Sequence, residues 1–336
     1  MKRTVYVTYT SATLRREGGV ISVNSEGKRV SQIWLHDLGQ IVLMGNVVLT
    51  PGALDLLVDQ GVDTVFLSHH GRYRGRIVHS LSGNVRLRLA QYEKLTDSGQ
   101  ALAVARAIVA GKIANMRTML LRFARRNGPS DRQKLSATAM RASIARVAIA
   151  TTLDEARGCE GSATHAYFRC FQDAILAEGF RFDGRNRRPP LDPVNALLSL
   201  GYTLLANVVE AAVNVVGLDP YVGSLHAVET GRPSLVCDLE EEFRAPVVDA
   251  VVVAAINKHV LQVDDFEDAG PGEPVVIKRE AVSRFVGLVE RRFRSDVLYD
   301  PIGQRIAWRQ VVEHQARAFA RFVLGDAPVY EPLVAR

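Results

Sequence analysis

The sequence contains little cysteine, with only Cys159, Cys170 and Cys237 among 336 residues. The three are widely spaced, form no CxxC motif and do not make an even set. This argues against a disulfide-stabilised scaffold and against a zinc ribbon. Free cysteines are typical of a reducing compartment, so we expect a cytoplasmic protein.

Long hydrophobic runs are also missing, and we expect no segment of membrane-spanning length. The segment APVVDAVVVAAI, residues 245–256, is too short to span a membrane and carries Asp249. The first residues, MKRTVYVTYTSATLRR, begin with basic side chains but return to polar ones too soon for a signal peptide. The sequence therefore predicts a soluble intracellular protein without a membrane partner.

Neither sign of charge dominates. The chain has 42 Lys and Arg against 36 Asp and Glu, which gives a formal net charge of +6 and a pI near 9.3. Such a mild basic excess permits nucleic-acid binding without requiring it. With 47% hydrophobic and 23% charged residues, the composition is that of a folded protein, long enough for one large domain or two ordinary ones.

A change of period near residue 88 divides the chain. Before it, β-branched and aromatic runs such as TVYVTYT, QIVLMG and DTVFLSHH alternate with turn signals, and one helix is expected between Pro51 and Gly61. After it, apolar residues recur every three or four positions. The helices expected there cover residues 100–126, 132–150, 152–178, 193–216, 234–258, 280–295 and 304–324. We predict an α+β fold, with a small β-rich N-terminal domain (1–88) followed by a larger all-α catalytic domain (89–336).

An unusual cluster of acids lies in SLHAVETGRPSLVCDLEEEFR, residues 224–244, where Asp238 and three glutamates occupy four of five positions behind His226. On a helix, Asp238, Glu241 and Glu242 would share one face. Carboxylates near a helix start, with Ser234 as a possible N-cap, account for one or two acids. A lone histidine in a loop is more often structural than a ligand. Four acids together still call for a further explanation.

Glu160 is the second unusual position, because Gly158 and Gly161 flank it inside a helical pattern. Each glycine costs a helix about 1 kcal/mol relative to alanine. Close approach of another helix or of a ligand to the backbone would explain both. The plain alternative is an exposed glutamate beside a kink.

Taken together, Glu160, His226 and Asp238 form a mixed oxygen and nitrogen ligand set suited to Mg²⁺ or Mn²⁺. Such an ion neutralises charge on a phosphoryl group and activates a hydroxyl or water for in-line attack. It also relieves the repulsion between clustered carboxylates. Zinc is disfavoured, because no cysteine has useful ligand spacing.

Arginines are placed where a phosphate substrate would need them, because the guanidinium fork matches phosphate oxygens. The loop RFDGRNRRPPLDP carries Arg181, Arg185, Arg187 and Arg188, and we favour DNA contact there. For the arginines of the long helix (Arg117, Arg122, Arg125 and Arg126), a solvated face is as good an interpretation as contact. HHGRYRGR adds Arg72, Arg74 and Arg76.

Three blocks in order and spacing, CEGSATHAYF, RNRRPPLDPVNALLSLGYTLL and GLDPYVGSLHAVETGRPSLVCDLEEEFR, resemble the CRISPR-associated endonuclease/integrase of spacer acquisition, the Cas-one (Cas1) family. The β-rich start with VFLSHHGRYRGRI and the helical remainder also match the family plan, so the resemblance covers most of the chain.

The resemblance implies that Glu160, His226 and Asp238 are catalytic metal ligands, with Glu241 at the position of a further acid. Either Glu241 or Glu242 could be that fourth acid. Asn195 and Tyr202 fall on positions lining the same cleft. Glu240 stands where the family commonly has an apolar residue.

The resemblance also implies a reaction and partners. A 3′-hydroxyl of double-stranded prespacer DNA attacks a repeat-boundary phosphate by metal-assisted transesterification. Members also act as metal-dependent DNA nucleases, form a homodimer through the β-domain and work with a small partner, Cas-two. Two other functions stay open. One is a structure-selective repair nuclease with water as nucleophile; the other is a DNA-binding subunit with a degenerate metal site.

Overall fold

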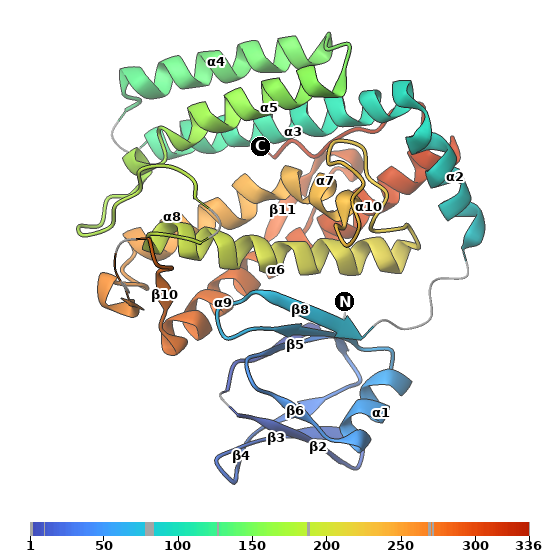
Figure 1. The fold of residues 1–336 in the computed structure, drawn as a ribbon, viewed down its shortest axis with the longest axis vertical. Helices are drawn as coiled ribbons and strands as arrows, with labels where there is room; N and C mark the ends of the chain where they lie inside the picture. The colour runs from blue at the N-terminus through green and yellow to red at the C-terminus, as the bar shows by residue number, and fades with distance from the viewer. Residues whose placement is uncertain are drawn as a thin grey trace.

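The computed structural model describes residues 3–9, 11–77, 84–125, 128–186, 189–267, 270 and 272–335. Two sheets and one helix form the β-rich N-terminal part, and the helices that follow it in the chain lie together on one side of it (Figure 1). The predicted α+β architecture is confirmed. The exact division at residue 88 stays a prediction; the last strand before the helices ends at Ile77 and the first helix after it begins at Val85.

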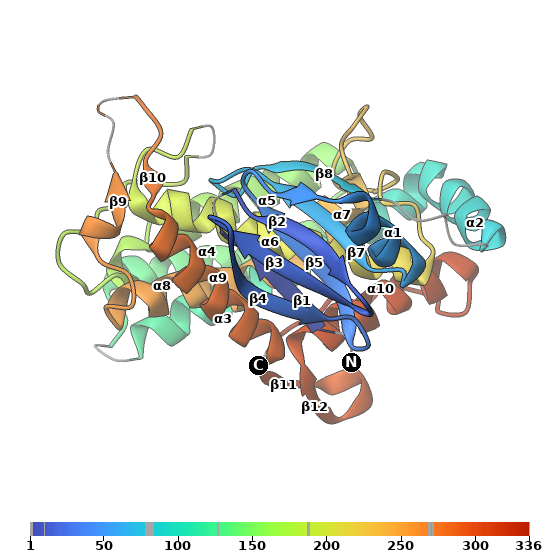
Figure 2. The ribbon, with the colours of Figure 1, turned by 90° about the horizontal axis from the view of Figure 1, so that it is seen from below.

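The N-terminal part pairs a mixed sheet with a second sheet, and Figure 2 shows the two from below. The first has the order β1-β5-β7-β8 and contains β1 (Arg3–Val7), β5 (Leu38–Met44), β7 (Asp63–Leu67) and β8 (Tyr73–Ile77). The second has the order β4-β3-β2-β6 and contains β4 (Lys28–Trp34), β3 (Val20–Ser25), β2 (Thr13–Glu17) and β6 (Val48–Leu49). The single predicted helix, α1 (Pro51–Asp59), starts at its proline and is followed by Gly61 at φ +62°.

The first sheet is buried on both faces, because successive side chains of a strand point to opposite sides. Ile41 and Leu43 of β5 pack into the core shared with the second sheet. Val42 and Met44 of the same strand join the large helical core instead. This sheet therefore connects the two parts of the molecule.

A buried ion network ties β8 to the helices. The Arg76 side chain, 2% exposed, reaches Asp63 Oδ1 at 3.2 Å and Glu210 Oε1 at 2.5 Å. The amide of Gln40 donates to Asp63 Oδ2 at 2.7 Å. The interpretation of Arg76 as part of a DNA-contacting stretch is therefore wrong, because its guanidinium is committed to this junction.

The helical part is built around α6 (Pro193–Val216), which runs between the N-terminal sheet and most of the other helices (Figure 1). Its predicted bounds are confirmed: Asp192 caps the first turn, and Gly217 ends the helix with φ +93°. The long α3 (Ser98–Ala124) packs with α4 (Asp131–Ala148) and α5 (Leu153–Phe168) on the other side. The remaining helices are α2 (Val85–Thr96), α7 (Ser234–Phe243), α8 (Ala250–Asn257), α9 (Arg279–Arg294) and α10 (Trp308–Leu324).

α6 corrects the expectation that no segment reaches membrane-spanning length. By length and composition alone it could cross a membrane, but 67% of its apolar window is buried inside the protein. Such burial is typical of the core helix of a soluble protein.

Three other expectations about the helical part are wrong in detail. Helix α5 ends at Phe168, ten residues before its predicted end at residue 178, because the chain turns there to bury Phe171 and Phe182 beside it. The segment 234–258 is not one regular helix: a wide turn, Arg244–Asp249, separates α7 from α8 around Pro246, which has no N–H to donate.

Residues 304–307 form a strand rather than the start of a helix. Two short hairpins, β9 (Phe266–Glu267) with β10 (Val276–Ile277) and β11 (Asp296–Tyr299) with β12 (Gln304–Ala307), make this part mostly helical rather than all-α.

Candidate active site

The loop before α7 is wrapped around the carboxylate of Asp238, which is fully buried. Oδ2 accepts hydrogen bonds from the backbone N–H groups of Ser224 at 2.6 Å and Leu225 at 3.0 Å. Oδ1 accepts from the backbone N–H of His226 at 2.9 Å. Gly223 makes this possible, since a Cβ there would lie 2.7 Å from Asp238 Oδ2 and 2.8 Å from the backbone of Leu235.

The same carboxylate orients the imidazole of His226. Its Nδ1 lies 2.7 Å from Asp238 Oδ1, and its Nε2 lies 3.9 Å from Glu241 Oε1. An ionised carboxylate only accepts, so Nδ1 is the ring nitrogen that donates to Asp238, and Nε2 is the ring nitrogen on the side of Glu241. Asp238 thus stands behind His226, while Glu241 stands on its open side.

Glu160 and Glu241 come together around a buried lysine. Lys112 of α3, with a side chain 6% exposed, forms an ion pair with Glu160 of α5 and another, at 2.8 Å, with Glu241 of α7. Thr164, one turn after Glu160, donates its hydroxyl to the same Glu160 oxygen at 3.0 Å. Three helices therefore bring two carboxylates and one ammonium to a single point.

Arg244 pairs with two neighbouring acids at the end of α7. It donates to Glu241 Oε1 at 2.5 Å and also binds Glu240. Burial alone would raise the pKa of Glu241, but Arg244 and Lys112 lower it to about 2. Glu240 is 4% exposed, so it faces neither solvent nor an open cleft, and burial raises its pKa.

Glu242 is turned away from this site toward the segment that follows α10. Tyr330 donates its hydroxyl to Glu242 Oε1 at 2.5 Å, and the backbone N–H of Leu333 donates to Oε2 at 2.8 Å. Burial raises the pKa of Glu242 to about 7 against these hydrogen bonds. Of the two candidates for the further acid, Glu241 is therefore the one placed with Glu160 and His226.

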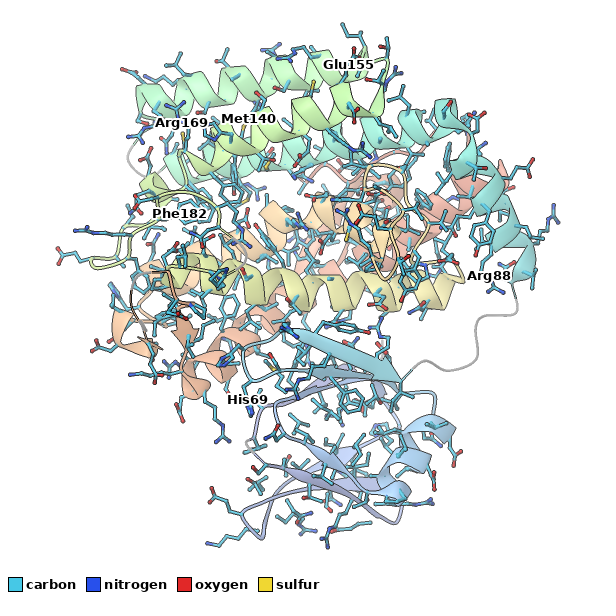
Figure 3. All side chains as sticks on the ribbon, viewed as in Figure 1. His69, Arg88, Met140, Glu155, Arg169 and Phe182 are labelled. Carbon is cyan, nitrogen blue, oxygen red and sulfur yellow. The ribbon has the colours of Figure 1, made fainter. Side chains whose placement is uncertain are left out.

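A cavity of about 290 Å³ opens onto the site, and Glu160, His226 and Glu241 line it together with Arg157 and Arg232. Asp238 is not among the residues that line it. A larger cleft of about 640 Å³ lies beyond Thr164. Its lining includes Arg132, His165, Arg169, Phe182 and Arg185, and Figure 3 labels Arg169 at the end of α5 and Phe182 in the loop that follows.

The two glycines beside Glu160 leave one face of α5 open. An added Cβ would meet nothing within 4 Å at either Gly158 or Gly161. The idea that another helix approaches the backbone here is therefore wrong. Gly161 instead lines the larger cleft, so its open face is accessible to a ligand.

The side chains predicted to contact DNA have different environments. Arg181 is exposed, whereas Asn195 is fully buried and donates to Gly184 O at 2.8 Å, so it shapes the loop from within. Arg185 donates to Asn195 Oδ1 at 2.6 Å and also lines the larger cleft. Arg187 and Arg188, like Arg126, lie outside the described residues.

Tyr202 is held by a buried acid beside the site. Its hydroxyl donates to Asp249 Oδ1 at 2.6 Å, and Tyr167 donates to Oδ2 at 2.9 Å. Burial raises the pKa of Asp249 to about 6, opposed by these two hydrogen bonds and by the charges of Arg185 and Arg244. Both guanidinium groups lie over the Tyr202 ring, at 5.4 and 5.0 Å from its centre.

Within the described ranges, no three His, Cys, Asp or Glu side chains are arranged as they would be around a metal ion. The donors are nevertheless compatible with one. Glu160, His226 and Glu241 line one cavity, and the ammonium of Lys112 stands between the two carboxylates. A mixed nitrogen and oxygen set around a positive charge fits Mg²⁺ or Mn²⁺.

Lys112, Arg244 and Asp249 were missed from the sequence. A signal for Lys112 existed, since it is the single charged residue in the apolar stretch AIVAGKIANM of α3. A lysine in the middle of a buried helix needs an acidic partner.

The fold and the site define a two-part α+β protein whose helical part holds a histidine and two carboxylates in a cleft flanked by arginines. Residues 5–291 match the family model described as CRISPR associated protein Cas1. The chain belongs to the Cas1 family. It is 39% identical over 334 residues to a CRISPR-associated endonuclease Cas1 of Thermus thermophilus, covering 99% of this chain and 97% of that protein.

Solved structures share this fold over nearly the whole chain. A casposase bound to its integration product superposes with a TM-score of 0.86 at 22% identity, covering 98% of this chain and 93% of that one. A chain of a Cas6-RT-Cas1–Cas2 complex gives 0.84 at 25% identity, covering 99% of this chain and 36% of that longer one. The first likeness concerns the fold alone.

Proposed function

We propose that this protein is a divalent-metal-dependent DNA endonuclease and integrase of CRISPR adaptation. It joins the 3′-hydroxyl of prespacer DNA to a phosphate at a repeat boundary of a CRISPR array. The observation that carries the proposal is the cavity in which Glu160, His226 and Glu241 meet, in a chain of the Cas1 family. A relative that matches over nearly its full length is named an endonuclease.

Glu160, His226 and Glu241 would hold Mg²⁺ or Mn²⁺. When bound, the ion supplies charge neutralisation at a phosphate oxygen and activation of the attacking hydroxyl. Asp238, expected from the sequence as a ligand, has both oxygens engaged by the 224–226 loop, and we assign it the orientation of His226. Such outer partners fix the tautomer and direction of a ligating histidine.

The arginines of the larger cleft would position the DNA backbone. Arg132, Arg169 and Arg185 line it from α4, from the end of α5 and from the loop before α6. Guanidinium groups bind phosphate oxygens without reading sequence, so these arginines would hold the DNA backbone rather than recognise bases. Their contribution to DNA affinity would fall steeply with salt.

Partners are proposed on two observations. The second sheet exposes apolar side chains on β4 and β6, among them Trp34 at 57% and Val48 at 56% exposure, and we propose that a second copy covers them in a homodimer. A structure that superposes on this chain is named as a Cas1–Cas2 complex, and we propose Cas2, the Cas-two partner above, as a partner here. We also propose that the protein acts in the cytoplasm, where a CRISPR array would be reached.

The test combines purified protein, a supercoiled plasmid carrying a CRISPR repeat and a labelled short duplex with free 3′-hydroxyls. Reactions contain Mn²⁺ or Mg²⁺, with and without Cas2, beside a His226→Ala variant. We expect label joined covalently to the plasmid by wild type only. His226 lies in a loop and is not part of the hydrophobic core, so the variant should stay folded and still bind DNA.

Other outcomes would contradict the proposal. Nicking or degradation of the plasmid without joining of the label would show that the protein is a nuclease with water as the nucleophile. An absence of any metal-dependent product, with Cas2 present, would make the protein a DNA-binding subunit. Unfolding of His226→Ala would give the histidine a structural role.

A further inference from the structure

Lys112 is a buried charge that the proposed reaction does not use. It lies near the middle of α3, where Ile108, Ile113 and Met116 around it are buried. A lysine side chain that is 6% exposed has lost almost all of its hydration. Such an ammonium is stable only beside opposite charges, which Glu160 and Glu241 provide.

The geometry makes Lys112 a bridge between two helices rather than one half of an ordinary pair. Glu160 belongs to α5 and Glu241 to α7, and the ammonium of Lys112 contacts both. Without a cation between them, two carboxylates in a low-dielectric site repel each other. The lysine therefore keeps them together in protein that carries no ion.

We propose that Lys112 is a positioning residue that serves as the counter-cation of Glu160 and Glu241 until a divalent ion replaces it at these carboxylates. The inference rests on the proposed metal function and deepens it. The two cations require the same oxygens, so each weakens the binding of the other. A protein built this way keeps an ordered site without metal and binds the ion only moderately tightly.

If Lys112 weakens the binding of the metal ion, removing its charge should strengthen that binding by the same factor. Removing the ammonium takes away a competitor and leaves the site one unit more negative, so the ion should bind more tightly. Coupling between sites is typically about 5- to 150-fold, and we expect a dissociation constant for Mn²⁺ lowered by about tenfold. The metal-free protein should at the same time become less stable.

The experiment compares wild type with Lys112→Met, which keeps the length of the stem and removes the charge. Lys134→Met is the matched control, since Lys134 is an exposed lysine on α4 paired with Asp131 at 3.0 Å. Each protein is stripped of metal with a chelator and titrated with Mn²⁺ by calorimetry. Thermal unfolding is recorded with and without Mn²⁺.

We expect Lys112→Met to have a lower metal-free midpoint, a larger rise of that midpoint on adding Mn²⁺, and the tenfold tighter binding. Lys134→Met should match wild type in all three. An unchanged or raised dissociation constant in Lys112→Met would overturn the inference, because the lysine would then support the ligands without competing for them.

Two further results separate the possible failures. If Lys112→Met does not fold without metal, Lys112→Arg is titrated instead. Because arginine keeps the competing charge, its Mn²⁺ affinity should stay near that of wild type, and a tenfold gain would refute competition. If wild type binds no Mn²⁺, the proposed metal function fails, whereas tight binding by wild type with no gain in the variant refutes only the role of Lys112.

Discussion

The contrast between Asp238 and its neighbours can be tested by replacing Asp238 with alanine in metal-free protein. A carboxylate whose only role is to bind a metal repels nearby acids when no ion is present, so removing it should be neutral or stabilising. A carboxylate that organises a loop should be costly to remove. The two accounts predict opposite signs for the change in the free energy of unfolding.

The magnitude follows from the hydrogen bonds. Asp238 accepts from three backbone N–H groups, on Ser224, Leu225 and His226, at 2.6 to 3.0 Å. A buried donor left without an acceptor costs about 1–3 kcal/mol, and partial relaxation of the loop makes the sum smaller than three full penalties. We expect a loss of about 3–5 kcal/mol.

The assay is urea unfolding in a chelator, supported by thermal unfolding. With about 2 cal/mol/K of unfolding entropy per residue, the thermal midpoint should fall by roughly 4–7 °C. Asp238→Asn keeps one acceptor oxygen, so its loss should be smaller, about 1–3 kcal/mol. Glu229→Ala is the control, an acid 63% exposed in the same loop. Wild-type stability in Asp238→Ala would refute the loop-organising role.

Three other substitutions test separate features. Gly161→Ala should raise the free energy of unfolding by up to about 1 kcal/mol, because alanine favours the helix and its methyl meets nothing within 4 Å. It should also weaken binding to a short duplex in a fluorescence titration, and unchanged affinity would remove the ligand-based reason for the glycine. For Asp249, burial raises the folded-state pKa from 3.8 to about 6, so the folded protein binds the extra proton and wild type loses stability as pH rises from about 4 to 6. Asp249→Asn lacks this loss, so its stability relative to wild type should rise by about 3 kcal/mol over that range in urea unfolding, and parallel pH curves would contradict the assignment. Arg76→Met leaves the partly buried carboxylates of Asp63 and Glu210 without their cation, so unfolding should require about 1–3 kcal/mol less, and a variant as stable as wild type would show that the junction does not depend on this network.

Local signals in the sequence were enough to predict the bounds of helices whose capping residues lie directly at their ends. The bounds of α6 follow from Asp192 and Pro193 at one end and Gly217 at the other, and the structure keeps them. The end of α5 could not be found in this way, because the turn after Phe168 packs against the ring of Phe182 from the loop that follows. Tertiary packing overrides a helical pattern at such places.

Charged residues were harder to assign than helices, because a side chain's role depends on partners far away in sequence. Arg76 and Arg185 look alike in the sequence, each in an arginine-rich stretch. The first is paired with Asp63 and Glu210 at a buried junction, and the second lines the larger cleft. Glu210 lies far from Arg76 in the sequence, so the residues around Arg76 give no sign that the two side chains form an ion pair.

The acid cluster that the sequence presents as one feature is divided among four environments. Successive residues of a helix point about 100° apart, so four acids in five positions cannot all face one cleft. Asp238 binds the preceding loop, Glu240 binds Arg244, and Glu242 binds the segment after α10. Only Glu241, among these four, lines the cavity with His226 and is in contact with Lys112. The other three acids contact the loop, Arg244 at the end of α7 and the last segment, so we propose that the cluster contributes one metal ligand, Glu241, and three acids that hold the surrounding structure.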